Sequence, residues 1–266
     1  MPNEPLPSNA ATKNETVQAA AVNAKLQRLL LLLVLGGFAL ALYNAGGTGG
    51  GTLGGVAATE WQARAHVLRE SVIVAWAVSL ADILLLRGGL GRLLGLRPRR
   101  LQGLLGFVFA PLLHRDLAHL VANTVPFMVL GWLVLIQDAL PNWTAFYGVS
   151  ATILLVGGLA TWLLGRAAIH VGASGLIFGY IGFLLVSGYA GPTLLTVGIA
   201  AVVLVMYGRQ LWGMMPTFLR KGGAGQRVSW EGHLFGFVGG VVAGLRPDWF
   251  GAVVARFEQM AQWLLQ

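Results

Sequence analysis

The chain has 266 residues, of which 56% are hydrophobic and only 11% are charged. Soluble domains carry roughly 25% charged residues, so the composition excludes an ordinary soluble domain and predicts a polytopic membrane protein. The net charge of +8 does not indicate nucleic acid, because the basic residues lie between apolar runs without interleaved stacking aromatics, and placement at anionic lipid explains them better. The absence of cysteine excludes disulfides, thiolate metal sites and a cysteine nucleophile.

The N-terminal quarter of the chain has three parts. Residues 1–25 are polar and contain too few large apolar side chains to bury a core, so we expect a disordered tail. The apolar run at 26–45 predicts an accessory transmembrane helix. It is followed at 46–66 by a glycine-rich stretch that includes "GGTGGGTLGG" and has the composition of a flexible linker.

Six further apolar runs approach the length of about 20 residues that a membrane-spanning helix needs. They lie at 67–86, 117–137, 143–164, 173–190, 193–208 and 230–247. The apolar piece 101–113 is too short to span, so we expect an interfacial or re-entrant segment there. Residues 251–266 place apolar side chains at helical spacing and predict an amphipathic helix on the membrane surface. The expected fold is all-α, with a six-helix core over 67–250 and one additional N-terminal transmembrane helix.

Polar side chains inside apolar runs are costly in a membrane and indicate function by default. His119 and Asn123 are four residues apart and share one helix face, Ser174 lies in "GASG", and His233 lies in "EGHLFGFVGG". Each also has a simple structural reading. Serine lets helices pack closely, a lone histidine can hydrogen-bond a carbonyl, and histidine and asparagine can join neighbouring helices.

Together, these four residues supply what acyl transfer requires. A serine becomes nucleophilic when an imidazole takes its proton, and the reaction also needs hydrogen-bond donors for the oxyanion. Small residues recur at helical spacing on the helices expected to carry Ser174 and His233: Gly175, Gly179 and Gly182 on one, and Gly232, Gly236 and Gly240 on the other. Such faces let two backbones approach closely, so the packing and catalytic readings are compatible.

The segments "HLVANT", "GASGLIFG" and "EGHLFGFVGG" resemble, in this order and on the second, fourth and sixth core helices, the signatures of the rhomboid intramembrane serine proteases. The resemblance implies that Ser174 is the nucleophile and His233 the general base, with no carboxylate partner. It also implies that His119, Asn123 and the Ser174 backbone N–H form the oxyanion hole, and that Gly172 is a backbone position beside the nucleophile.

Other positions differ from the family or have structural roles. Many rhomboids have a tyrosine four residues after the nucleophile, where this chain has Phe178, which can still stack on the base. The Trp-Arg pair common in the first loop is absent, and "RPRRLQGLLG" stands there. We expect structural roles for His114 and Glu231, and a local capping or pairing role for Asp82.

The function implied is an intramembrane serine endopeptidase that cleaves transmembrane segments of membrane-protein substrates through an acyl-enzyme. Such an enzyme needs no cofactor and no metal, binds no nucleic acid, and has the lipid bilayer and its transmembrane substrates as partners. We expect an integral, multi-pass protein of the bacterial plasma membrane. The alternatives are a rhomboid-like pseudoprotease, which usually lacks the serine or the histidine, and a transporter, for which inverted repeats and paired broken helices are missing. A zinc protease is disfavoured because no HExxH occurs.

The direction in which the site opens is left undecided by the sequence. In the common six-span rhomboid form the active site opens outward, which would place the basic first and fifth loops outside. The positive-inside rule disfavours that arrangement. A spanning helix at 26–45 would put both loops inside, and the charge count favours this one-plus-six arrangement.

Overall fold

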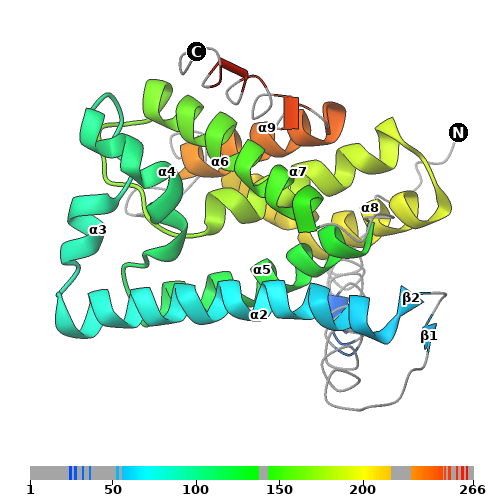
Figure 1. Cartoon of the computed structure of the whole chain (residues 1–266). Coiled ribbons are helices and arrows are strands. Elements are labelled where there is room, and N and C mark those ends of the chain that lie inside the picture. The colour runs from blue at the N-terminus through cyan, green and yellow to red at the C-terminus, as the bar shows by residue number, and fades with distance from the viewer. Residues whose placement is uncertain are drawn as a thin grey trace, which may run out of the picture.

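The computed structural model describes residues 58–137, 143–216 and 229–247, with isolated positions before and after them. The tail expected at 1–25, the accessory helix at 26–45 and the surface helix at 251–266 lie mostly outside the described residues. The two-residue strands β1 (Thr52–Leu53) and β2 (Val56–Ala57) pair antiparallel inside the glycine-rich stretch. Otherwise the described part of the chain is built from helices and their connections (Figure 1).

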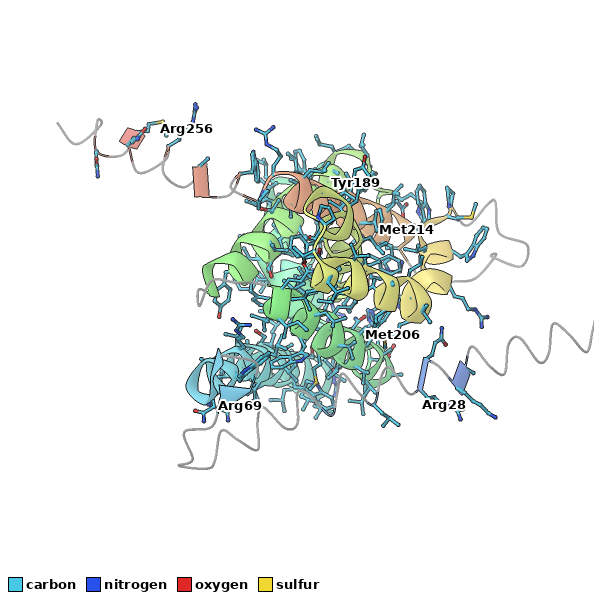
Figure 2. The ribbon with its side chains drawn as sticks, turned by 90° about the vertical axis from the view of Figure 1, so that its right-hand side faces the viewer. Arg28, Arg69, Tyr189, Met206, Met214 and Arg256 are labelled. Atoms are coloured by element: carbon cyan, nitrogen blue, oxygen red, sulfur yellow. The ribbon has the colours of Figure 1, made fainter. Side chains whose placement is uncertain are left out.

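The first core helix, α2 (Ala58–Leu80), begins at Ala58 instead of residue 67, and it continues into the π-helical turn η1 (Ala81–Leu85). The difference arises because Glu60, Gln62 and Arg64 make residues 58–66 too polar for a hydropathy pattern to include. Those residues are good helix formers, so the helix extends beyond its apolar part. Figure 2, which views the molecule at a right angle to Figure 1, places Arg69 on the outer side of α2.

The first loop consists of the short helices α3 (Gly89–Leu94), η2 (Leu101–Leu105), α4 (Gly106–Phe109) and η3 (Ala110–Leu112). The expected non-spanning segment at 101–113 is therefore a series of short helical turns. The buried Asp82 carboxylate accepts hydrogen bonds from the backbone N–H groups of Leu90 (2.8 Å) and Gly91 (2.9 Å). Asp82 thus caps α3, and its expected local role is confirmed.

The remaining core helices are α5 (Leu117–Gln137), α6 (Trp143–Leu164), α7 (Ser174–Ala190), α8 (Leu194–Tyr207), which η4 (Gly208–Met214) extends, and α9 (Trp230–Leu245). Their bounds lie within two residues of the expected spans, apart from the η4 extension. In the described part, three stretches are long and apolar enough to cross a membrane: Leu117–Gln137, Phe146–Leu164 and Leu194–Met214. The fold is that of an all-α polytopic membrane protein.

The closest approach in the bundle is between α7 and α9, where glycines replace side chains. A Cβ added to Gly236 would overlap the carbonyl oxygen of Gly175, and one added to Gly240 would overlap that of Gly179. A Cβ on Gly182 would overlap the Phe237 carbonyl oxygen. These overlaps are with backbone atoms, which cannot rotate away as a side chain could, so only glycine allows this spacing.

The arginines collect at one end of the bundle. The loop after α2 contacts the loop between α6 and α7 through an antiparallel bridge between Leu96 and His170, and Arg99 N–H donates to the Trp162 carbonyl (2.9 Å). The end of η4 reaches α9 at the same end, because the Gly213 carbonyl lies 3.4 Å from His233 Nδ1. Eight arginines of the described residues belong to these loops: Arg87, Arg92, Arg97, Arg99, Arg100, Arg115, Arg166 and Arg209.

The positive-inside rule therefore predicts that this end faces the cytoplasm. A topology reporter that is active only outside the membrane should be silent when fused after Met215 and active when fused after Pro192, which lies between α7 and α8. The opposite pair of results would contradict this orientation.

Candidate active site

Ser174 is the first residue of α7 and follows a turn that only glycine suits. Gly172 has φ +112°, which L side chains rarely adopt, and its N–H donates to the Ala110 carbonyl (2.8 Å). A Cβ on Gly172 would lie 2.6 Å from the His119 ring and 3.3 Å from Asn123 Nδ2. The two polar side chains of α5 therefore lie directly against the backbone just before Ser174.

His233 is buried in the first turns of α9, and two neighbours fix its ring. Phe178 stacks on it with ring centroids 4.1 Å apart and an interplanar angle of 10°. The Gly213 carbonyl lies 3.4 Å from His233 Nδ1 and can accept a hydrogen bond from a proton on that nitrogen. A proton on Nδ1 leaves the lone pair on Nε2, the form in which an imidazole acts as a base.

Ser174, His233, His119 and Asn123 line one cavity of about 280 Å³. Asn123 Nδ2 and His119 Nδ1 are buried and have no hydrogen-bond partner among the described residues. Buried polar atoms are normally paired, because an unpaired one costs about 1–3 kcal/mol. An unpaired amide donor such as Asn123 Nδ2, on a residue that lines the cavity with Ser174, suits an anion that forms only during reaction.

His114, in the loop before α5, supports His119. Its Nδ1 lies 2.9 Å from Ser79 Oγ, which itself donates to the Leu112 carbonyl (2.8 Å). The His114 ring packs edge-on against His119, with centroids 5.1 Å apart. Burial, with a further contribution from His119, lowers the pKa of His114 to about 4. His114 is therefore neutral at physiological pH and acts as a support for His119, in agreement with the structural role expected.

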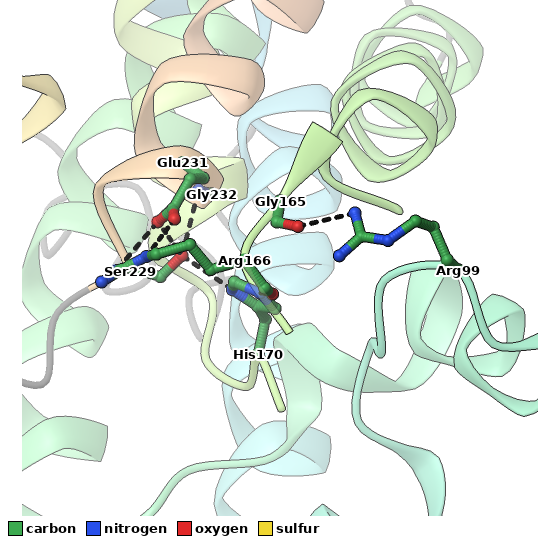
Figure 3. Close-up of polar contacts among 7 residues, drawn as sticks. All are labelled: Arg99, Gly165, Arg166, His170, Ser229, Glu231 and Gly232. Carbon is green, nitrogen blue, oxygen red and sulfur yellow. Dashed lines mark hydrogen bonds and ion pairs between the residues drawn. The ribbon is translucent and has the colours of Figure 1, made fainter. Parts of the chain in front are cut away.

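A polar network joins the loop before Ser174 to the start of α9 (Figure 3). His170 Nδ1 lies 2.7 Å from Ser229 Oγ, and Ser229 caps α9 by accepting the Gly232 N–H (3.1 Å). Arg166 forms an ion pair with Glu231, with Nη2 to Oε2 at 3.1 Å. The network fixes the start of α9, and hence His233, relative to the loop that leads to Ser174.

Sequence reasoning missed His170, Ser229, Arg166 and Gly213. Three of them contact the start of α9 from a loop or from its N-cap, where no periodic pattern marks a residue: Arg166, His170 and Ser229. Gly213 acts through its carbonyl, which every residue has. Ser229 carried a detectable signal, since serine before a glutamate and an apolar helix is a typical N-cap. Glu231 pairs with Arg166, which agrees with the structural role expected for it.

Comparison with known proteins places the chain in a family. The family model described as "Rhomboid domain" matches residues 102–246, more than half of the 266 residues, and the chain belongs to the rhomboid family. This is a family of intramembrane proteases, and the chain is an integral membrane protein.

Relatives occur in mycobacteria. Uncharacterized proteins of Mycobacterium bovis and Mycobacterium tuberculosis are 46% identical over 155 residues, and one of Mycobacterium leprae is 44% identical over the same length. The match covers 56% of this chain and 61% of the M. bovis and M. tuberculosis proteins, against 58% of the M. leprae protein. No solved structure matches the chain.

The Arg166–Glu231 pair provides a stability test. We expect Glu231→Gln to lower the free energy of unfolding by about 2 kcal/mol, because the Arg166 guanidinium loses its charged acceptor and a neutral amide takes the place of the buried carboxylate. Glu70→Gln removes the partner of an exposed pair, Arg69–Glu70, and should change the free energy of unfolding by less than about 0.5 kcal/mol. Denaturant unfolding in detergent measures both variants, and equal losses would contradict a specific role for Glu231.

Proposed function

We propose that this rhomboid is an active intramembrane serine endopeptidase in which Ser174 is the nucleophile and His233 the general base. Its substrates would be transmembrane segments of other proteins, and its location the bacterial plasma membrane, as the mycobacterial relatives suggest. The proposal rests on one observation: a single cavity is lined by the serine, the histidine and two polar side chains with unpaired buried nitrogens.

In the first step His233 Nε2 takes the proton of Ser174, and Ser174 Oγ attacks the peptide carbonyl. Two features support His233 in this role. The Gly213 carbonyl accepts from Nδ1 and stabilises the imidazolium, where a carboxylate does so in the serine–histidine–aspartate arrangement. The face of Phe178 fixes the ring plane and excludes water from one side.

The oxyanion that forms would accept hydrogen bonds from Asn123 Nδ2, from His119 and from the Ser174 N–H. Because Ser174 is the first residue of α7, its N–H has no intrahelical acceptor, and the helix N-terminus carries partial positive charge. His233 then protonates the leaving amine, and water hydrolyses the acyl-enzyme. A peptide bond must leave its helix to reach Ser174, so helix-destabilising residues near the cleavage site should favour a substrate.

The cavity holds a second serine next to an imidazole, Ser229 beside His170, but its geometry does not suit attack. Ser229 Oγ already accepts a hydrogen bond from the Gly232 N–H and thereby caps the N-terminus of α9. The oxygen's lone pair is engaged in a helix cap, and using it as a nucleophile would uncap α9. The N-cap position of α7 is Ala173, which makes no side-chain capping bond, so Ser174 is not the cap of its helix.

Labelling with a serine-reactive fluorophosphonate and cleavage of a model membrane substrate test the proposal. Ser174→Ala and His233→Ala should each reduce cleavage by about 10⁶-fold, to below detection, and abolish labelling. Asn123→Ala should be slowed by about 100- to 1000-fold, since one oxyanion donor is lost while the dyad stays.

The matched control is Ser187→Ala, which removes a hydroxyl from the same helix. Ser187 donates to the Phe183 carbonyl (2.8 Å) and does not line the cavity. The Ser187→Ala variant should be labelled by the fluorophosphonate and should cleave the model substrate like the unaltered protein. Labelling that persists in Ser174→Ala and disappears in Ser229→Ala would overturn the assignment of the nucleophile.

A further inference from the structure

The first loop combines exposed arginines with exposed leucines, and no acidic residue lies between Ile83 and Arg115. Residues 83–115 contain six arginines and no aspartate or glutamate. Of the two acids that flank this stretch, Asp82 is 1% exposed and its carboxylate accepts from the backbone of α3, while Asp116 lies at the far end, directly after Arg115. The five arginines from Arg87 to Arg100 therefore have no acidic residue among them in the sequence.

Three of the arginines are held next to one another. Arg92 Nη1 donates to the Arg87 carbonyl (3.0 Å), and Arg97 Nη2 donates to the Arg92 carbonyl. Arg97 Nε is buried and has no hydrogen-bond partner among the described residues. Like-charged side chains repel one another, so a cluster of this kind is stabilised by an anion.

Large apolar side chains are exposed beside these arginines. Leu84 and Leu85, just before Arg87, are 69% and 78% exposed, and Leu101 and Val108 are 82% and 64% exposed. In Figure 1 the loop, marked by α3 and α4, forms one end of the molecule. Arginine heads at a phosphate layer with aliphatic side chains below it are the pattern of a segment that lies in the membrane interface.

We propose that residues 84–109, the arginine–leucine surface, bind anionic phospholipid. The guanidinium groups of Arg87, Arg92 and Arg97 bind headgroup phosphate, and the exposed leucines lie among the acyl chains. Guanidinium matches phosphate through paired N–H donors, and an anionic headgroup carries a net charge that a zwitterionic one lacks. Lipid held here lies against the loop whose residue Arg99 caps the end of α6 through the Leu163 and Gly165 carbonyls. The surface is independent of the proposed protease activity.

The test measures lipid retention by the full-length protein. Purified protein is equilibrated with equal amounts of phosphatidylglycerol and phosphatidylcholine in mixed micelles, and bound lipids are counted by native mass spectrometry. The unaltered protein should retain phosphatidylglycerol preferentially. Each arginine near an anionic headgroup contributes about fivefold in affinity, so Arg87→Gln/Arg92→Gln should reduce the preference by at least about tenfold.

The matched control, Arg209→Gln/Arg246→Gln, removes the same charge from exposed positions elsewhere and should keep the preference. Arg87→Lys/Arg92→Lys keeps the positive charge and should retain most of the preference for phosphatidylglycerol. This variant separates lost binding from misfolding. No preference in the unaltered protein would overturn the proposal, and so would equal losses in both glutamine variants. Displacement of the lipid by soluble glycerophosphate at equal concentration would also overturn it, because the site would then recognise free phosphate.

Discussion

The backbone contact between α7 and α9 is the constraint on which the rest of the site depends. A serine side chain is short, so its hydroxyl can meet an imidazole on another helix only when the two helix axes approach very closely. Gly236 and Gly240 allow this because their Cα atoms lie against the carbonyls of Gly175 and Gly179. In a membrane, where lipid is as apolar as leucine, such close packing is also a main source of helix association. The same glycines therefore stabilise the fold and position the site.

Close packing sets the distance between the helices, and polar contacts at one end set their register. The His170–Ser229 hydrogen bond and the Arg166–Glu231 pair attach the start of α9 to the loop before Ser174. The Gly213 carbonyl and the Phe178 ring then orient His233, and His114 packs against His119. The two candidate catalytic imidazoles, His233 and His119, are thus each held in place by neighbouring groups. The first loop, through Arg99 and Leu96, joins the same assembly.

Much of this arrangement could be predicted from the sequence, for physical reasons. A membrane helix must satisfy its backbone internally, so apolar length marks the spans, and α5 and α6 begin and end as expected. Ser174, His119, Asn123 and His233 were identifiable because polar side chains are conspicuous in apolar runs. The start of α2 could not be predicted from apolar length, because the first half of this helix is polar. Gly213 and the Arg166–Glu231 pair were also hidden, because a carbonyl contact and a pairing across 65 residues leave no local pattern.

The measurement that tests the central claim most directly is fluorophosphonate labelling of a glycine variant. Gly240→Ala adds one methyl group to α9, and this group would overlap the Gly179 carbonyl of α7. The change is away from Ser174 in both helices, but it should greatly reduce labelling of Ser174. Gly198→Ala adds the same group on α8, where nothing lies within 4 Å, and should be labelled normally. Full labelling of Gly240→Ala would contradict the claim that the close contact of α7 and α9 assembles the site.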